Sequence, residues 1–388
     1  MLARLPLCRT CTMIRFMFFN QYHKRRVLVT GHTGFKGFWL CAWLLELGAE
    51  VAGYSLDIPT NPSGFTALGL QSRITHITGD VRERPALCKA LEAFRPEVIF
   101  HMAAQSLVRP SYEDPVKTVE TNALGTLNLL EAVRQAPFVQ SLVLITSDKC
   151  YRNDEWVFGY RETDHLGGKD PYSASKACAE IIAHAYFPSF FQAGTRMATA
   201  RAGNVIGGGD WALDRIVPDC ARAWLAGAPA LIRSPGATRP WQHVLEPLSG
   251  YLWLGASLLE GAERGGMPLH GESFNFGPAA EVNASVGELA EALARHWPGF
   301  SLSVDPAAPD GKDGKEATLL RLCCDKALAH LDWKAVLPFA DAIRLTAEWY
   351  RQAAVGGIRA DNGMAAFTAA QIEEYSAMAR EQNAAWTL

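Results

Sequence analysis

Tyr172 and Lys176, in the stretch KDPYSASKACAEIIAHAY, have the chemistry and the spacing of a proton-transfer pair. A spacing of four places both on one face of a helix, and Pro171 suits the first turn of that helix. An unperturbed tyrosine has a pKa near 10 and is a poor base at neutral pH. We expect the ammonium of Lys176 and the positive ring of a cofactor to lower the pKa of Tyr172. The pair could then take a hydroxyl proton while hydride leaves the same carbon for a nicotinamide.

A second group of polar side chains follows the apolar run SLVLI in the stretch LITSDKCY. Here a hydroxyl (Ser147, with Thr146 beside it), a carboxylate (Asp148) and an ammonium (Lys149) follow one another at the expected end of a strand. Ligands of open α/β sheets bind at the carboxyl ends of the strands. We therefore interpret these residues as a candidate catalytic group rather than as a solvated charge pair.

A glycine pattern near the start of the chain predicts a dinucleotide site. In VLVTG-HTGFKG, Gly31, Gly34 and Gly37 come directly after a strand and at the opening of a helix. Glycine is needed where the chain turns tightly and where its backbone approaches a pyrophosphate, which then meets the free N–H groups of the helix. The neighbouring loop residues are included in the candidate cofactor site: Thr33, Phe35 and Lys36.

Residues after the next three strands complete this site. Asp57 follows the second strand, where a carboxylate would bond ribose hydroxyls, and no arginine sits beside it to receive a 2′-phosphate, so NAD is favoured over NADP. Asp80 could meet the adenine edge, and Ala103 and Ala104 are small enough to let the backbone pass close to a cofactor. His101, inside an apolar strand, is expected to be a buried structural residue. The site also includes Val81, Gln105 and Asn122.

The elements that must position these groups alternate along the chain. Candidate strands at 26–31, 50–56, 75–79, 98–103, 141–147 and 197–203 are separated by stretches with helical periodicity, such as 39–47, 86–94 and 119–133. This alternation predicts an α/β fold with a Rossmann-type, doubly wound parallel sheet. After Gly203 the alternation breaks down, and the remaining helices indicate a smaller C-terminal substrate-binding lobe.

We expect three segments. Residues 1–23 form an N-terminal extension that is disordered or reflects a misassigned start, with Met17 as the candidate initiator; a weak targeting signal is the alternative. Residues 24–203 form the NAD-binding Rossmann domain. Residues 204–388 form mainly the substrate-binding lobe, with chain crossings back to the first domain near 240–280, where HGESFNFG resembles one more strand of the sheet.

Composition excludes several classes of partner. The net charge of −3 and the pI near 6.4 argue against nucleic acid or an acidic membrane surface. No apolar run reaches the roughly 18 residues of a membrane span. The nine cysteines form no four-ligand pattern, since Cys8-x-x-Cys11 stands alone and Cys323 and Cys324 are adjacent, so we predict no metal. We interpret the thiols as reduced residues of a cytoplasmic protein.

The chain resembles an extended short-chain dehydrogenase/reductase. Within that superfamily it resembles the NAD-dependent nucleotide-sugar 4,6-dehydratases, and most closely those that act on CDP-glucose. The resemblance implies tightly held NAD, a hexose nucleotide as substrate with CDP-glucose favoured, and a homodimer through a helix bundle or a higher homo-oligomer. The motifs that carry it run from about Arg26 to about Leu248: VTGHTGFKG, HMAAQSLVRPSY, TSDKCY, the Y-x-x-x-K helix, GNVIGGGDW and RPWQHV.

The resemblance also implies an internal redox cycle. Tyr172 removes the C4 hydroxyl proton as hydride passes to NAD, water is eliminated across C5 and C6, and the hydride returns to C6. Asp148 matches the acid that protonates the leaving hydroxyl, and Ser147 aligns with the hydroxyl that polarises the C4 oxygen. Most dTDP- and GDP-sugar dehydratases place a Glu next as the C5 base. Here that position is Lys149, which agrees with the CDP-glucose branch.

Two roles for Lys149 remain open. As a neutral amine it could take the C5 proton, but burial and the like charge of Lys176 would have to lower its pKa from about 10.4. Alternatively it stays protonated and stabilises the developing enolate, while water takes the proton. We favour the direct role.

The family resemblance places further residues at the substrate. Asn204 resembles the family's asparagine that contacts the sugar or the diphosphate, and Arg215 and Arg239 are expected to grip the diphosphate. Trp241 and His243 could bound the nucleotide pocket, although Trp241 suits the core equally well. Two residues in the loop after the fourth strand are placed at the sugar site: Arg109 and Tyr112.

Two other functions remain as alternatives. An NAD-dependent epimerase or reductase would leave the C6 hydroxyl in place or consume cofactor, and Asp148-Lys149 argues against it. A non-catalytic dinucleotide sensor on the same fold would often lack the tyrosine or the lysine, and both are present here.

Overall fold

The computed structural model describes residues 16–388 except 262, 280, 298–300, 305–318 and 357–362. Its centre is a seven-stranded sheet in the order β13-β6-β5-β4-β1-β2-β3, and every neighbouring pair is parallel. The α/β, Rossmann-type fold expected from the sequence is confirmed. The strands are β1 (Arg26–Thr30), β2 (Glu50–Ser55), β3 (Thr75–Thr78), β4 (Val98–His101), β5 (Ser141–Ile145), β6 (Arg196–Ala202) and β13 (Ser273–Phe276).

The order of the strands reverses between β1 and β4. Leu28 of β1 pairs with Ala52 of β2 on one side and with Ile99 of β4 on the other. In open α/β sheets such a reversal leaves a crevice at the carboxyl ends of the strands, where ligands bind. The loops after β1, β4 and β5 therefore meet at one edge of the sheet.

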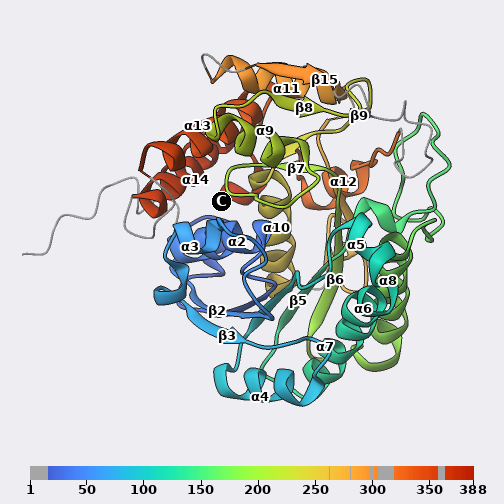
Figure 1. Cartoon of the computed structure of the whole chain (residues 1–388). Helices are drawn as coiled ribbons and strands as arrows, with labels where there is room; N and C mark the ends of the chain where they lie inside the picture. The colour runs from blue at the N-terminus through green and yellow to red at the C-terminus, as the bar shows by residue number, and fades with distance from the viewer. Residues whose placement is uncertain (1–15, 262, 280, 298–300, 305–318, 357–362) are drawn as a thin grey trace, which may run out of the picture.

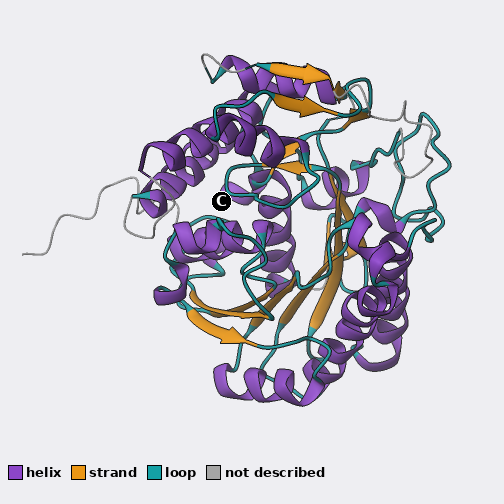
Figure 2. Cartoon of the chain, viewed as in Figure 1, coloured by secondary structure: helices purple, strands orange, loops and turns teal. Residues whose placement is uncertain are grey.

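Helices cover both faces of the sheet (Figures 1 and 2). Val27 and Val29 pack into one core with α2 (Phe35–Glu46) and α10 (Leu245–Glu260), whereas Leu28 packs into the other core. This alternation follows from the strand period of two. On the face of Leu28 lie α4 (Arg84–Phe94), α7 (Gly125–Arg134) and α8 (Pro171–Phe190). Shorter elements on this part of the chain are α3 (Gly64–Ala67), η2 (Leu70–Ser72), α5 (Val108–Glu113), α6 (Pro115–Val119), the π-helical turn η3 (Glu120–Leu124) and η4 (Asp148–Cys150).

A second lobe lies above the carboxyl edge of the sheet in Figure 1. The chain returns from it to the first sheet within 240–280, because α10 covers one face of the sheet and β13 extends it. The remaining strands are β7 (Val205–Ile206), β8 (Ala230–Ile232), β9 (Thr238–Arg239), β10 (Gln242–His243), β11 (Glu263–Arg264), β12 (Met267–Pro268), β14 (Ala284–Ser285) and β15 (Leu302–Val304). The remaining helices are α9 (Ile216–Leu225), α11 (Val286–Arg295), α12 (Asp325–Leu331), α13 (Phe339–Gly356), α14 (Met364–Glu381) and η5 (Ala385–Thr387).

The described part of the expected N-terminal extension belongs to the fold. Met17 and Phe18, at the start of η1 (Phe18–Asn20), are buried, and the ring of Phe18 stacks on Trp386 at a centroid distance of 5.4 Å. The backbone nitrogen of Phe19 donates to the carbonyl of Leu388 at 2.8 Å. The predicted disorder of residues 1–23 is therefore wrong for residues 17–23. The aromatic side chains of Phe18 and Tyr22 are buried in the core next to the C-terminal segment. Residues 1–15 lie outside the described residues.

None of the helices in the described ranges combines the length and the apolar character needed to cross a membrane.

Candidate active site

The turn between β1 and α2 accepts only glycine at two positions. Gly31 has a φ of +75°, and a Cβ atom there would lie 2.7 Å from the backbone nitrogen of Ala103. A Cβ at Gly37 would lie 2.2 Å from the carbonyl oxygen of Gly31. Gly34 precedes α2 and supplies no side-chain cap, so the first N–H groups of the helix keep their capacity to donate. This cradle fits the pyrophosphate of a dinucleotide.

The two acidic residues of the candidate cofactor site differ in whether their carboxylates form an ion pair. Asp57 is exposed directly after β2, and its carbonyl accepts a 2.6 Å hydrogen bond from the hydroxyl of Thr33, which ties the glycine turn to this strand. Asp80 forms an ion pair with Arg82 at 2.6 Å, and hydrogen bonds from Arg82 lower the pKa of the Asp80 carboxyl. Asp57 therefore presents its carboxylate to solvent, whereas Asp80 already has a cationic partner. Val81 is buried, and a Cβ at Gly125 would lie 2.7 Å from it.

Asn122 joins the loop after β4 to the catalytic helix. Its amide accepts from the backbone nitrogen of Gln105 at 2.8 Å and donates to the carbonyl of Gln105 and to the hydroxyl of Ser175. This buried amide is therefore used to fix the loop that carries Ala103 and Ala104. His101 is also buried, with Thr30 at 2.7 Å from its Nδ1, and burial lowers its pKa to about 3. The expectation of a structural histidine agrees with this environment.

The helix α8 presents Tyr172 and Lys176 from the same face. The side chain of Asp170 caps the helix by accepting from the backbone nitrogen of Ser173 at 2.9 Å, and Pro171 is its first residue. Tyr172 and Lys176 are 7% and 6% exposed. The ammonium of Lys176 lies 3.5 Å from the carbonyl oxygen of Ile145, at the end of β5. The pair therefore stands beside the residues that follow this strand.

Burial reverses the expected effect on the pKa of Tyr172. Burial raises this pKa to about 12; the hydroxyl of Ser147 and the charge of Arg215 lower it, and Asp148 raises it. Burial also lowers the pKa of Lys176 to about 8, while Glu180 raises it. The lowering of the Tyr172 pKa that we expect from Lys176 and the positive ring of a cofactor together is not found in the protein without ligands, because removing the phenol from water opposes its ionisation more strongly.

The residues Ser147 to Lys149 form a compact turn at the end of β5. The hydroxyl of Ser147 accepts from the backbone nitrogen of Lys149 at 3.2 Å and donates to Oδ1 of Asp148 at 2.9 Å. Asp148 is only 3% exposed, whereas Lys149 is half-buried. A Cβ placed on Gly203, directly after β6, would lie 3.1 Å from Oδ2 of Asp148. The absence of a side chain at residue 203 thus gives the Asp148 carboxylate its space.

A buried ion pair lies beneath this turn. Glu180, one helical turn after Lys176, pairs with Arg201 of β6 at 2.9 Å and accepts hydrogen bonds from Thr199 at 2.8 Å and from Thr146. Arg201 also donates to the hydroxyl of Tyr151 at 2.7 Å. Thr146 and Tyr151 flank the turn on its two sides, so this network fixes the backbone that carries the candidate catalytic group.

Of the candidate substrate residues in this part of the chain, Arg109 and Tyr112 are exposed, whereas Arg215 is partly buried. Arg109 and Tyr112 are exposed and belong to α5 rather than to a loop, and Arg109 forms an ion pair with Asp214 at 3.2 Å. Arg215 forms an ion pair with Asp210 at 2.8 Å, which raises the pKa of Arg215, and its charge acts on Tyr172.

Two other candidates line the strands of the second lobe. Asn204 follows β6, is partly buried, and accepts from the backbone nitrogen of Gln242 at 3.3 Å. Arg239 lies in β9 and donates to the carbonyl of Thr238 at 2.8 Å. Both side chains remain partly accessible.

The structure places His243 and Trp241 in the core. His243 is fully buried in β10, with its ring 5.9 Å from that of Trp39, and burial lowers its pKa to about 3. The prediction that His243 bounds the nucleotide pocket is wrong, because β10 pairs with β7 in the interior and leaves its side chain no solvent face. Trp241 is 6% exposed and donates to the carbonyl of Ala284 at 2.9 Å, which favours the core alternative.

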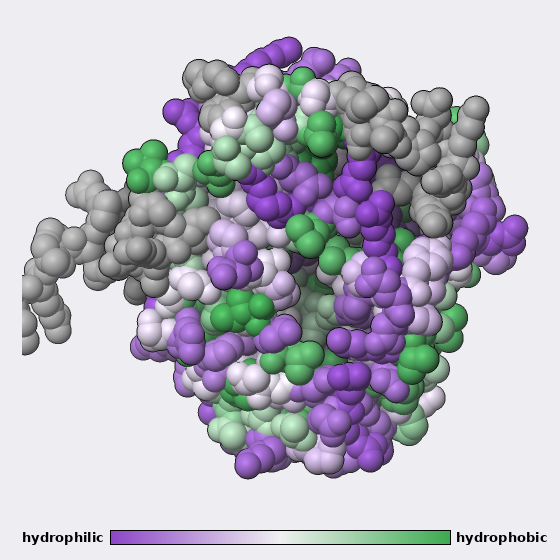
Figure 3. All heavy atoms as spheres, in the orientation of Figure 1, coloured by the Kyte–Doolittle hydropathy of each residue, from purple (hydrophilic) through white to green (hydrophobic). Residues whose placement is uncertain are grey.

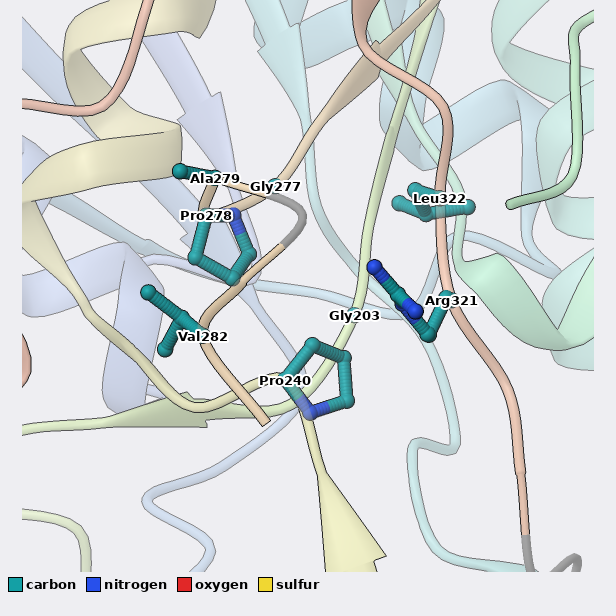
Figure 4. Close-up of a pocket in the computed structure, with 8 residues that line it drawn as sticks. All are labelled: Gly203, Pro240, Gly277, Pro278, Ala279, Val282, Arg321 and Leu322. Carbon is teal, nitrogen blue, oxygen red and sulfur yellow. The ribbon is translucent and has the colours of Figure 1, made fainter. Parts of the chain in front are cut away.

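A small pocket adjoins the candidate catalytic group through Gly203. Figure 4 shows Pro278 and Val282 on one side of it and Arg321 and Leu322 on the other. Sequence reasoning missed Arg321, because it lies far along the chain in no recognisable motif. In the space-filling view, the surface is hollowed near the middle of this face, between the second lobe and the sheet (Figure 3). The pocket is lined by Gly203, Pro240, Gly277, Pro278, Ala279, Val282, Arg321 and Leu322.

Within the part of the chain that the structure describes, His, Cys, Asp and Glu side chains form no group of three or more that could hold a metal ion.

Comparisons with known proteins agree with this geometry. A family described as GDP-mannose 4,6 dehydratase matches residues 28–261. The chain is 45% identical over 342 residues to the CDP-glucose 4,6-dehydratase of Salmonella typhimurium, covering 86% of this chain and 92% of the relative. It is 27% identical to a probable dTDP-glucose 4,6-dehydratase of Sinorhizobium fredii, covering 84% of this chain and 92% of the relative.

Solved structures show the same fold. The UDP-glucose 4-epimerase of Thermus thermophilus in complex with NAD has a TM-score of 0.70 at 29% identity, covering 84% of this chain and 99% of that chain. A dTDP-glucose 4,6-dehydratase of Streptomyces venezuelae, with NAD and TYD bound, has a TM-score of 0.68 at 25% identity, covering 84% of this chain and 97% of that chain. Both dehydratases and epimerases therefore share this architecture.

Proposed function

The chain belongs to the GDP-mannose 4,6-dehydratase family, and from this premise we propose that it is an NAD-dependent lyase that converts CDP-glucose to CDP-4-keto-6-deoxyglucose and water. The observation that carries the proposal is the position of Asp148. This buried carboxyl is hydrogen-bonded to Ser147, and Ser147 in turn acts on the hydroxyl of Tyr172. A carboxyl group that could donate a proton thus lies next to the base that would deprotonate the C4 hydroxyl, as water elimination requires and simple epimerisation does not.

The residues of the glycine turn fit NAD. Gly31 and Gly37 leave a cradle that any Cβ would fill, and the first turn of α2 offers N–H groups to the pyrophosphate. Asp57 is exposed directly after β2, where its carboxylate suits ribose hydroxyls. When bound, NAD would supply the acceptor of two electrons at C4 and the donor of the same electrons at C6. We propose that residues 24–203 form the NAD-binding unit and that residues 204–388 supply mainly the substrate lobe.

Tyr172 would act as the base at C4. Its phenolate takes the C4 hydroxyl proton, while Ser147 hydrogen-bonds the same oxygen and Lys176 supplies positive charge from the next turn of α8. Because burial raises the pKa of Tyr172, the positive charges of the bound ligand and of Arg215 have to offset that rise. General base help of this kind typically contributes about 10²–10⁴-fold to the rate.

Asp148 and Lys149 would carry the elimination step. A ketone at C4 acidifies the C5 proton, and the buried Asp148 gives its proton to the departing C6 oxygen. The half-buried Lys149, next to Asp148 in η4, takes the C5 proton or stabilises the charge that develops at C5. Because the hydrogen-bonded turn holds Asp148 and Lys149 next to each other, both could act in the same elimination step.

Replacing Lys149 by Met separates the two roles of this residue. We expect the rate of C5 deuterium exchange from solvent to fall by about 10²–10⁴-fold if Lys149 is the base. Mass spectrometry of CDP-glucose recovered from deuterated buffer measures the exchange. The exposed Lys89 of α4, replaced by Met, is the matched control and should exchange normally. Exchange at the normal rate in the Lys149→Met variant would rule out the direct base.

The diphosphate and the nucleobase would bind between the lobes. Arg215, Arg239 and Arg109 would supply guanidinium groups, and Asn204 directly follows Gly203, which lines the pocket. The pocket walls at Pro278 and Val282 suit a base, and CDP is favoured over other nucleotides by the 45% identity to a CDP-glucose enzyme.

A homodimer is proposed from an exposed apolar patch on α6, η3 and α8. Val116, Val119, Leu124 and Ile181 are 66%, 39%, 47% and 56% exposed, and these three elements contact one another. Clusters of this kind on a soluble protein mark association surfaces. A cytoplasmic location is supported by the free thiols of the seven cysteines that the structure describes.

Replacing Ile181 by Asp tests the patch. We expect the charge to shift the assembly from dimer to monomer, because an unpaired carboxylate would be buried in the interface. Sedimentation velocity measures the state. Val355 of α13 is 87% exposed away from the patch, so Val355→Asp is the control and should leave the assembly unchanged. A dimeric Ile181→Asp variant would contradict the proposed interface.

A panel of substrates tests the proposed function. Purified protein is incubated with NAD and, separately, CDP-glucose, dTDP-glucose, UDP-glucose and GDP-mannose, and the products are identified by mass spectrometry. We expect loss of water from CDP-glucose without net consumption of NAD. A product that keeps its C6 hydroxyl would indicate an epimerase, net consumption of cofactor a reductase, and no product from any sugar a sensor.

A further inference from the structure

One aspartate joins the two lobes. Asp214 lies in the loop before α9, in the second lobe, and its Oδ1 accepts a 3.2 Å hydrogen bond from Nη1 of Arg109 on α5. The same oxygen accepts from Nη1 of Arg233 at 2.9 Å, and Arg233 directly follows β8 of the second lobe. Two guanidinium groups, one from each lobe, therefore share a single carboxylate oxygen.

This shared carboxylate lies between the lobes, beside the edge of the sheet where ligands bind. The helix α5 follows the loop after β4, which ends at the carboxyl edge, and α5 packs against the catalytic helix α8. The helix α9 belongs to the lobe above that edge (Figure 1). The contact between Arg109 and Asp214 therefore spans the region in which the proposed function places the diphosphate.

The start of α9 adds positive character next to Asp214. Arg215 directly follows Asp214 as the N-cap residue of α9, and its side chain makes no cap hydrogen bond. The first turn of a helix has unpaired N–H groups and a partial positive charge. On the other side, Arg233 is held by a second carboxylate, since its Nη2 lies 3.5 Å from Asp219. Asp219 is also paired with Arg222.

The backbone of the loop fixes where Asp214 lies. Asp214 has a φ of +60°, in the left-handed region that aspartate and asparagine adopt more readily than most other residues with a side chain. The preceding part of the loop is anchored in the core, because Nε1 of Trp39 donates to the carbonyl of Gly208 at 2.9 Å. The hydroxyl of Tyr350 donates to the carbonyl of Asp210. A loop with a fixed base thus presents this carboxylate to both arginines.

We propose that Asp214 holds the place of the substrate diphosphate between Arg109 and Arg233, and that the diphosphate displaces its carboxylate when the nucleotide sugar binds. This inference rests on the proposed function. A guanidinium has paired N–H donors that match a phosphate, and a diphosphate offers one phosphate to each arginine. A single carboxylate carries less charge than a diphosphate. Arg233 is then a substrate-binding residue, and Asp214 sets the affinity of the site.

The exposure of these ion pairs suits an exchange of partners. The side chains of Arg109, Arg233 and Asp214 are 68%, 43% and 44% exposed. Water and salt weaken ion pairs of this kind, so a more highly charged ligand can replace the carboxylate. In the free protein, the carboxylate keeps two guanidinium groups close together that would otherwise repel each other. The site is therefore arranged for its ligand before the ligand arrives.

Asp214→Asn is the central variant of the test. Asparagine keeps the acceptor oxygen and tolerates the positive φ, but it lacks the charge that competes with the diphosphate. We expect the dissociation constant for CDP to fall by about 3- to 20-fold, the range for two exposed ion pairs that no longer have to be broken. Isothermal titration calorimetry measures it. Glu92→Gln on α4 is the matched control, because it removes one negative charge from an exposed pair with Arg95, and it should bind CDP normally.

Arg233→Gln and Arg109→Gln should act in the opposite direction. Each removes a charged donor to the diphosphate, so the dissociation constant for CDP should rise by about 5- to 50-fold. With CDP-glucose the loss should appear in KM rather than in kcat, because these residues contact the diphosphate and not the reacting carbons. Asp214→Asn should improve affinity less in the Arg233→Gln background than it does alone, because the carboxylate then competes for one arginine only.

Ligands with and without phosphate separate this role from a structural one. Inorganic pyrophosphate carries the diphosphate alone, whereas cytidine carries the nucleoside alone. Asp214→Asn should bind pyrophosphate and CDP more tightly and cytidine no differently. An ion pair that only tied the lobes together would instead change the affinities for cytidine and CDP alike, and its loss would lower the thermal midpoint.

Three results would overturn the proposal: unchanged or weaker binding of CDP by Asp214→Asn, an equal change with cytidine, or unchanged binding of CDP by Arg233→Gln. These binding measurements need no turnover. If the unmodified protein forms no 4-keto product from any sugar of the panel, the proposed function itself fails, whatever the variants bind. A normal unmodified enzyme whose variants bind CDP as it does refutes the diphosphate site alone.

Discussion

Replacing Tyr172 by Phe is expected to lower kcat with CDP-glucose by about 10²–10⁴-fold, since this removes the base at C4. Every later step needs the ketone at C4, so neither the 4-keto intermediate nor the 6-deoxy product should accumulate. Quantifying both by mass spectrometry after a quench measures the effect.

The control for this variant lies on the same helix. The hydroxyl of Tyr186 donates to Glu131 at 3.0 Å, away from the catalytic group, so Tyr186→Phe should turn over normally. The base must be ionised to act, and burial raises the pKa of Tyr172 to about 12 in the protein without ligands. The unmodified enzyme should therefore gain rate as pH rises on the acid side. A Tyr172→Phe enzyme with normal turnover would refute the assignment.

Replacing Glu180 by Ala is expected to lower the free energy of unfolding by about 3–5 kcal/mol, because it leaves the buried guanidinium of Arg201 without its partner. Urea denaturation followed by circular dichroism measures the loss. The exposed Glu291 of α11, replaced by Ala, is the control and should change little. Removing both charges, in Glu180→Leu with Arg201→Met, should cost less than the single change.

The pH dependence of stability follows from the same pair. Burial alone would raise the pKa of Glu180, but the charge and the hydrogen bonds of Arg201 lower it to about 2 from an ordinary 4.5. A carboxyl group whose pKa is lowered by folding stabilises the folded protein at any pH above the pKa of that group in the unfolded chain. That stabilisation should be lost as pH falls from about 4.5 towards 2, and the Glu180→Leu, Arg201→Met protein should lack this part of the acid sensitivity.

Local patterns in the sequence were sufficient for the sheet and the glycine turn. Val27, Leu28 and Val29 are all apolar because both faces of the strand are covered. Gly31 is recognisable in the sequence because its close approach to the backbone of Ala103 allows no other residue. Tyr172 and Lys176 were predictable for the same reason, since a helical spacing of four fixes their common face.

Side chains whose place depends on distant segments were not predictable. Lys36 meets Tyr251 across 215 positions of the chain, and no local pattern indicates that contact. His243 was placed at the nucleotide pocket because it shares a family motif with Arg239, yet β10 pairs with β7 and the His243 side chain is buried. The pKa of Tyr172 depends on how completely the fold removes it from water, which spacing does not reveal.

The contact between Gly203 and Asp148 bears on attempts to redesign base preference by directed evolution. A mutational library aimed at accepting other nucleotides would vary the walls of the pocket, such as Pro278, Ala279 and Val282. Residue 203 belongs to the same lining, but a side chain there would meet Oδ2 of Asp148 at 3.1 Å. Variants with a side chain at residue 203 are therefore expected to lose turnover, whatever their effect on nucleobase preference. Keeping glycine at this position would let nucleobase preference be changed without this loss.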